Sequence, residues 1–196
     1  MNKEINYITF QSGEIKLKKA TGLKAEQLQS FLCSAFLDNT ILAVGTFKGE
    51  LFLFNSGSFS KSLKAHNGSI NSIYVFKNEF LTGGNDGIIL TWDMDLCIKL
   101  KVSIINDTIN SLCPKIRSVC INENNDILIG TRAGEVIEYS NETFNIIIRG
   151  HFDMELWALC MHPNRDIYYT AGQDKLLAEW DIESKCILRV YYNLII

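Results

Sequence analysis

The sequence has little proline, no closely paired cysteines and no long apolar run. The two prolines, Pro114 and Pro163, both fall between apolar segments, so the backbone donors of a β-ladder are retained. The six cysteines include no CxxC pair, which argues against a zinc site and predicts small core residues in a reducing compartment. No stretch of 18 apolar residues and no apolar signal segment occurs. We therefore expect a cytoplasmic protein that neither crosses a membrane nor is secreted.

Positive charge is also too scarce for a nucleic-acid surface. The 19 Lys and Arg residues stand against 22 Asp and Glu residues, which gives a net charge of −3. Residues 1–64 nevertheless hold 8 basic and 5 acidic residues, a local excess of +3. The run 14–19 alternates apolar and charged residues up to Lys18, as a half-buried outer strand does. Its lysines favour solubility and edge protection, and binding to an acidic partner is the alternative.

Motifs for catalysis and cofactor binding are absent as well. The sequence contains no glycine-rich phosphate loop, no G-x-S-x-G and no H-E-x-x-H. His162, followed by proline, is expected in a turn rather than as a metal ligand. We therefore expect no cofactor, no metal and no enzyme activity.

A motif that ends in Trp-Asp occurs twice and indicates an internal repeat. Residues 81–93 and 169–181 both place an aspartate four residues after a threonine and a tryptophan six residues after that aspartate. Weaker copies at 45–54 and 130–139 keep the small-residue turn and the final aromatic residue. The equivalent aromatic residues are Phe54, Trp92, Tyr139 and Trp180, at spacings of 38, 47 and 41 residues.

A period near 40 residues, with short apolar runs between turns, predicts four-stranded blades of an all-β propeller. In one unit we expect strands over Ile70–Phe76, Phe80–Gly83, Ile88–Trp92 and Cys97–Val102. The whole chain, 1–196, is predicted to be a propeller segment of about four and a half blades. The expected half blade is 1–20, and the expected blades are 31–64, 65–103, 115–149 and 150–192.

The half blade creates a difficulty for closing the ring. A propeller that opens in the middle of a blade closes by pairing strands from its two ends. Only residues 193–196 follow the last expected strand, which is too little for two further strands. We expect a piece of a larger propeller or a ring completed by other chains, with an exposed strand edge.

Two units carry a set of polar residues that can form a hydrogen-bonded chain. The sets are His66, Thr82, Asp86 and Trp92, and His151, Thr170, Asp174 and Trp180. The indole donates, the hydroxyl accepts and donates, and the carboxylate fixes the imidazole tautomer. A catalytic relay uses the same groups. The structural interpretation is favoured because the set occurs twice and ends on a tryptophan donor where a substrate would need space.

Equivalent turns supply candidates for partner contact. Loops on a rigid scaffold commonly carry binding residues. The turns of the four units place these residues at one position: Phe47, Asn85, Arg132 and Gln173.

The Trp-Asp pairs with their preceding histidine and aspartate resemble the WD-repeat family of β-propellers, most specifically in two of the four units. Residues 150–159, Gly-His-Phe-Asp-Met-Glu-Leu-Trp-Ala-Leu, followed by His162-Pro163, resemble a stretch of the echinoderm microtubule-associated protein-like family. The stretch departs from that family by an extra Met154 and by Ala158 in place of glycine. The family's N-terminal coiled coil, tied to microtubule attachment, is absent from this sequence.

The resemblance implies a non-catalytic interaction scaffold with protein partners, namely tubulin or microtubules, and a cytoplasmic or cytoskeletal location. A general WD-repeat scaffold in an unrelated complex is the alternative. An enzyme would require a cleft with a perturbed titratable group.

Overall fold

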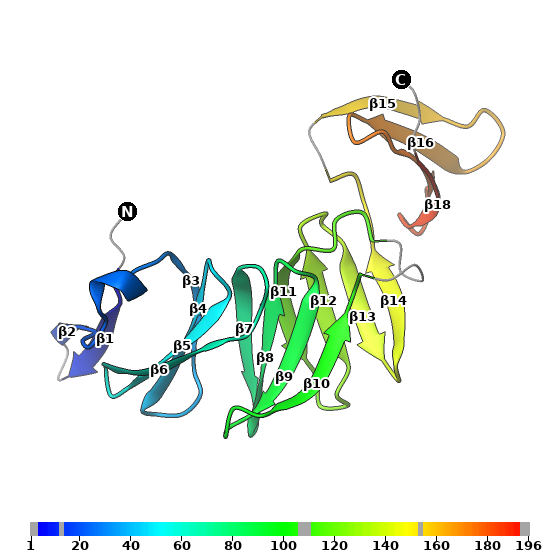
Figure 1. The fold of residues 1–196 in the computed structure, drawn as a ribbon. Coiled ribbons are helices and arrows are strands. Elements are labelled where there is room, and N and C mark those ends of the chain that lie inside the picture. The colour runs from blue at the N-terminus through cyan, green and yellow to red at the C-terminus, as the bar shows by residue number, and fades with distance from the viewer. Residues whose placement is uncertain (1–3, 12–13, 106–110, 153–154, 193–196) are drawn as a thin grey trace.

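The computed structural model describes residues 4–11, 14–105, 111–152 and 155–192, and these residues form an all-β chain (Figure 1). Within them, the strands make one two-stranded sheet and four four-stranded antiparallel sheets. The helical content of this part is one 3-10 turn, Ala25–Gln27, and no helix in it is long and apolar enough to cross a membrane. The predicted all-β blade architecture is confirmed.

Each sheet is a simple up-and-down meander. The half sheet contains β1 (Asn6–Gln11) and β2 (Glu14–Lys19). Sheet 1 contains β3 (Phe31–Phe36), β4 (Ile41–Thr46), β5 (Glu50–Asn55) and β6 (Ser58–Lys64). Sheet 2 contains β7 (Ile70–Phe76), β8 (Glu79–Gly84), β9 (Ile88–Asp93) and β10 (Ile98–Ser103). Sheet 3 contains β11 (Ile116–Ile121), β12 (Ile127–Thr131), β13 (Val136–Ser140) and β14 (Thr143–Ile148). Sheet 4 contains β15 (Leu156–Met161), β16 (Ile167–Gly172), β17 (Leu177–Asp181) and β18 (Ile187–Tyr191).

The core lies between neighbouring sheets, because each sheet is apolar on both faces of its inner strands. Ala43 and Leu51 of sheet 1 pack against Ile70 and Phe80 of sheet 2. On the other face of sheet 2, Leu81 and Ile89 pack against Ile116, Ile127 and Ile129 of sheet 3. The first strands stack in turn, β7 on β3 and β11 on β7. Sheets 1 to 3 therefore form a row (Figure 1).

Glycines make this close approach of the sheets possible. A side chain at Gly45 would meet Ile70 Cγ2 at 2.8 Å, and one at Gly83 would meet Ile116 Cγ2 at 2.7 Å. A methyl group fits at neither position without displacement of the neighbour. These strand glycines of β4 and β8 thus set the distance between sheets.

Sheet 4 stands apart from this row (Figure 1). All six residues of β15 are exposed, including Leu156, Leu159 and Met161. Among the described residues, β15 makes no packing onto sheet 3 comparable to that of β7 on β3. The fourth sheet is folded but its first strand is uncovered.

Two sequence expectations about burial are wrong. Cys97 and Cys186 are exposed in turns, and Cys160 is exposed on uncovered β15. Cys113 and Cys120 are half-buried, and Cys33 alone is half-buried against the core between sheets 1 and 2. Strand β2 is exposed along its whole length rather than half-buried. Its apolar residues face away from sheet 1, and the described residues place no further sheet on that side.

Candidate interaction site

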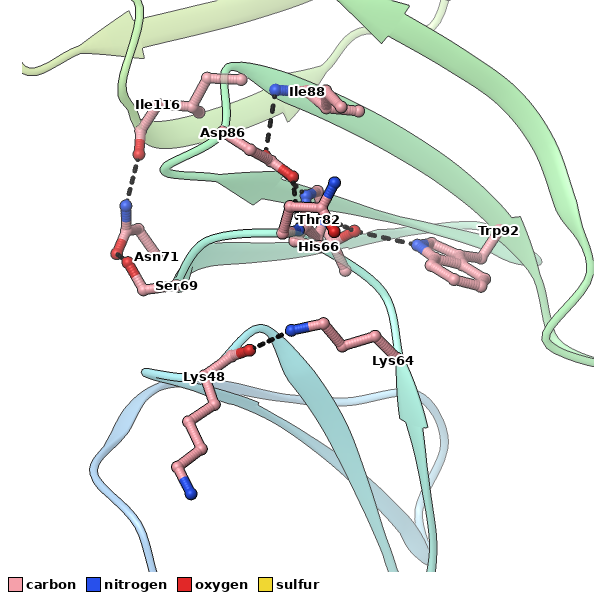
Figure 2. Close-up of polar contacts among 11 residues, drawn as sticks. Lys48, Lys64, His66, Ser69, Asn71, Thr82, Asp86, Ile88, Trp92 and Ile116 are labelled. Carbon is pink, nitrogen blue, oxygen red and sulfur yellow. Dashed lines mark hydrogen bonds and ion pairs between the residues drawn. The ribbon is translucent and has the colours of Figure 1, made fainter.

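In sheet 2, a buried polar chain ties the segment before β7 to the turn between β8 and β9. Thr82 Oγ1 lies 3.0 Å from the donating Trp92 Nε1 and 2.8 Å from His66 Nε2, and His66 Nδ1 lies 3.0 Å from Asp86 Oδ1. Figure 2 shows His66 between the aspartate and the threonine. Asp86 Oδ2 also accepts the backbone N–H of Asn67 at 2.8 Å. The donors and acceptors match when the imidazole proton is on Nδ1.

Sheet 4 repeats the same chain. Trp180 Nε1 donates to Thr170 Oγ1 at 2.7 Å, and that hydroxyl lies 2.8 Å from His151 Nε2. His151 Nδ1 lies 2.9 Å from Asp174 Oδ2, which accepts the backbone N–H of Phe152 at 3.2 Å. The structure thus brings all eight sequence-predicted residues into two equivalent networks.

The sheet 2 network has no room for a reacting group. His66 and Thr82 are 2% and 0% exposed, and the threonine oxygen already contacts both the indole and the imidazole. Burial by itself raises the pKa of Asp86, but the hydrogen bonds from His66, Asn67 and Ile88 together hold that pKa below its ordinary value. The carboxylate is therefore stabilised in the charged form that accepts these bonds.

Sheets 1 and 3 hold their incoming loops with a glutamate, which was not among the residues predicted from the sequence. Glu135 is 1% exposed and accepts hydrogen bonds from Ser111 Oγ, from the Leu112 N–H at 3.2 Å and from Thr131 Oγ1 at 3.1 Å. Arg149 Nε donates to it at 3.0 Å, which forms an ion pair whose carboxylate is fully buried and whose guanidinium is 15% exposed. The loop before β11 is thereby attached to the turn between β12 and β13.

Glu50 holds the corresponding place in sheet 1. Its carboxylate accepts Gln29 Nε2, while Gln29 Oε1 accepts the backbone N–H of Lys48 at 3.2 Å. Gln29 is 6% exposed and precedes β3. Both glutamates end the same short motif, Gly-Thr-x-x-Gly-Glu, at 45–50 and 130–135. Sequence patterns alone identify these segments as weaker copies of the histidine motif and do not single out the glutamate.

In each four-stranded sheet, the turn between the second and third strands carries one residue at an equivalent position. These are Phe47, Asn85, Arg132 and Gln173, whose backbone N–H groups donate to Ser30, Ser69, Lys115 and Glu155 at 2.9, 2.8, 2.8 and 2.9 Å. Each acceptor immediately precedes the first strand of its own sheet. Phe47, Arg132 and Gln173 are exposed and Asn85 is half-buried. We call these four residues the rim residues.

The four rim residues have chemically different side chains, although their turns share the same backbone hydrogen bond. An aromatic ring, two amides and a guanidinium emerge at equivalent points of the four sheets. Such a surface can recognise a partner by its pattern of side chains. Among the described residues, no group of three or more His, Cys, Asp or Glu could hold a metal ion.

The repeat, the buried networks and the four-stranded sheets are those of β-propeller blades, and they are similar to WD repeats. The family model "WD domain, G-beta repeat" matches residues 57–93, which cover β6 to β9. The computationally designed Ika8 protein, known from a crystal structure, shares the fold with a TM-score of 0.51 at 19% identity, over 94% of this chain and 60% of its own.

The particular proteins that this chain resembles are echinoderm microtubule-associated protein-like proteins. Human echinoderm microtubule-associated protein-like 2 is 26% identical over 92% of this chain and 28% of its own length. Human echinoderm microtubule-associated protein-like 4 is 27% identical over 90% of this chain and 19% of its own length. The chain thus spans less than a third of these relatives. WD-repeat blades and these relatives support a protein-interaction scaffold.

Proposed function

We propose that the chain is a non-catalytic platform that binds tubulin or microtubules through the rim residues. The observation that carries this proposal is the shared backbone hydrogen bond of the four turns, which fixes four chemically different side chains at equivalent places. A rigid scaffold lowers the entropy lost when a partner binds.

The nature of the partner comes from the relatives. Both human relatives are named as microtubule-associated. The likeness covers most of this chain, so the blades are the part that this chain has in common with them. The proposal therefore places microtubule contact on the blades themselves.

The absence of catalysis in this proposal rests on the polar networks. The histidine, threonine and aspartate that could form a relay are hydrogen-bonded to each other and capped by tryptophan. These groups hold loops in place, which leaves partner binding as the task of the exposed turns.

Co-sedimentation with polymerised microtubules tests the proposal. The wild-type chain is expected to pellet with microtubules, and Phe47→Ser combined with Arg132→Glu is expected to weaken binding about tenfold or more. The matched control is Met94→Ser combined with Lys77→Glu, exposed residues in turns at the opposite ends of the strands.

The outcomes separate the alternatives. Equal loss in both double variants would place the contact away from the rim residues. A wild-type chain that stays in the supernatant would overturn the microtubule proposal and favour a general scaffold in another complex.

A further inference from the structure

A groove opens between sheets 1 and 2 at the end of the strands opposite the rim residues. Its volume is about 290 Å³. Leu53 and Phe54 of β5, which are 4% and 0% exposed, form the buried part of its lining. The walls include Leu37 of the β3–β4 turn and Leu96 of the β9–β10 turn. The groove is therefore an apolar cleft between two neighbouring sheets.

One wall of the groove holds a leucine in a conformation that leucine rarely adopts. Leu96 has a φ of 69°, in the left-handed region that favours glycine or asparagine. Its side chain packs against the core between sheets 1 and 2. At the corresponding turn of sheet 4, Lys185 adopts a φ of 60°. The turn itself does not require an apolar residue, so the apolar wall is a property of this groove.

Lysines border the groove from both sheets. Lys61 of β6 lines it and pairs across the strands with Leu53. Lys101 of β10 pairs with Leu90, which packs in the same core as Leu53. Because paired residues of neighbouring strands share one face of a sheet, the two lysines lie on the facing surfaces of sheets 1 and 2. Both are exposed, and the described part of the chain gives neither of them an ion pair.

The outer strands in this half of the chain concentrate positive charge. Strands β2, β6 and β10 hold seven of the 19 basic residues of the chain and one of its 22 acidic residues. An outer strand does not require lysines in this fold, because β14, the outer strand of sheet 3, has no charged residue. Edge protection therefore does not account for two lysines on facing surfaces beside an apolar groove. The one carboxylate in the groove lining belongs to Asp95.

We propose that this groove and its two lysines bind an extended acidic segment of a partner protein. Carboxylates of the segment pair with Lys61 and Lys101, and an apolar side chain between them enters the groove over Leu53. Charge complementarity selects an acidic segment. Bases of a nucleic-acid strand would need an exposed aromatic ring to stack on, and Phe54 is fully buried. The groove lies away from the rim residues, so this proposal does not rest on microtubule binding.

Fluorescence anisotropy with the full chain tests the two charges. The probe is a labelled peptide of glutamates with one central leucine. Lys61→Glu with Lys101→Glu is expected to weaken its binding about tenfold or more. Lys175→Glu with Lys185→Glu, at exposed turn positions of sheet 4, makes the same change in net charge and should weaken binding about twofold or less. Equal loss in the two double variants, or a wild-type chain that does not bind the peptide, would overturn the proposal.

A block of the groove tests its apolar lining separately. Ser60 is exposed and lines the groove, so Ser60→Trp places a ring in it and should weaken binding of the same peptide about tenfold. Ser62→Trp is the matched control, because Ser62 is exposed on the same strand but pairs with Phe52 on the opposite face of sheet 1. This variant should bind like the wild-type chain. Equal affinity of the two tryptophan variants would show that the groove is not the site.

A labelled single-stranded DNA oligonucleotide separates a polypeptide from a nucleic acid as the occupant. It should bind the wild-type chain about tenfold more weakly than the peptide does, because its bases find no stacking surface in the groove. An oligonucleotide that binds as tightly as the peptide, and loses as much affinity in Ser60→Trp, would overturn the assignment to an acidic polypeptide.

Discussion

At the scale of residues, each sheet attaches its incoming loop to one turn, and it does so with one of two chemistries. Sheets 2 and 4 use a histidine and an aspartate, whereas sheets 1 and 3 use a glutamate that accepts bonds from the loop. Both solutions satisfy buried donors and acceptors, which would otherwise cost about 1–3 kcal/mol each. The loop and the rim residue of each sheet are therefore fixed together.

Removal of one partner from the sheet 2 network should destabilise the fold. Asp86→Ala is expected to lower the free energy of unfolding by about 1–3 kcal/mol, because His66 loses a buried hydrogen bond. Trp92→Ala is expected to lower it by about 3–5 kcal/mol, because the cavity left by the buried indole adds to the hydrogen bond that Thr82 loses. Urea denaturation measures the effect. Asp95→Ala, at an exposed position in the turn after β9, is the control and should be neutral. Unchanged stability in both network variants would contradict a structural role.

Because of Asp86, the stability of the folded chain should also depend on pH in the acidic range. The folded state lowers the pKa of Asp86 from its ordinary value of 3.8, so the unfolded chain binds protons more readily in this range. Its contribution is present above about pH 4 and is lost as the pH falls through the lower folded pKa. Asp86→Asn should therefore lose less stability than the wild-type chain between about pH 5 and pH 2.5, as followed by urea midpoints. Parallel curves for the two proteins would argue against this.

Glu135 should contribute more to the stability of the fold than Glu50, because only Glu135 forms an ion pair with a basic side chain. Glu135→Gln leaves the Arg149 guanidinium, 15% exposed, without its carboxylate, and should cost about 3 kcal/mol. Glu50→Gln keeps an oxygen that can accept from Gln29 and should cost about 1 kcal/mol or less. Chemical denaturation of both variants checks the order. A larger loss in Glu50→Gln would contradict the role assigned to the ion pair.

At the scale of elements, the distance between sheets is set by glycine. Gly83→Ala is expected to destabilise the chain by about 1–3 kcal/mol, because the new methyl group falls within 2.8 Å of Ile116 and Val119. Gly150→Ala, which meets no described atom within 4 Å, should stay within about 0.5 kcal/mol. Thermal unfolding of the two variants measures the difference. Equal stability of the two would show that the sheets can move apart freely.

The sequence predicted the all-β class because the Trp-Asp motif, the turn residues and the apolar runs all recur with one period. It also identified both histidine networks, since their four residue types keep the same spacing. The Glu135 anchor was missed because its partners Ser111 and Arg149 lie 24 and 14 residues away with no repeated spacing. The exposure of Cys160 was missed because an apolar strand looks the same whether or not another sheet covers it.

At the scale of the whole molecule, the half sheet leaves a second apolar surface uncovered. Its outward side chains are Ile8, Phe10, Ile15 and Leu17, exposed by 58, 76, 65 and 71%. They form the cross-strand pairs Ile8 with Leu17 and Phe10 with Ile15. Contiguous exposed apolar residues next to a free strand edge promote association.

Charge on this surface should reduce self-association without loss of stability. Phe10→Lys with Leu17→Lys is expected to shift the chain toward monomer in analytical ultracentrifugation, with an unchanged melting temperature. Lys61→Glu with Lys101→Glu, on outer strands of sheets 1 and 2, is a control for changed charge. Association that persists in the half-sheet variant would assign it to another surface.

Hydrogen exchange at the rim residues tests the central claim, that buried anchors hold these four turns rigid, most directly. In the wild-type chain, the amides of Phe47, Asn85, Arg132 and Gln173 should exchange slowly, as strand amides do. Asp86→Ala should speed exchange at Asn85 while Arg132 stays slow, and Glu135→Ala should do the reverse. Fast exchange of all four amides in the wild-type chain, or an equal effect of both variants at both positions, would contradict the account.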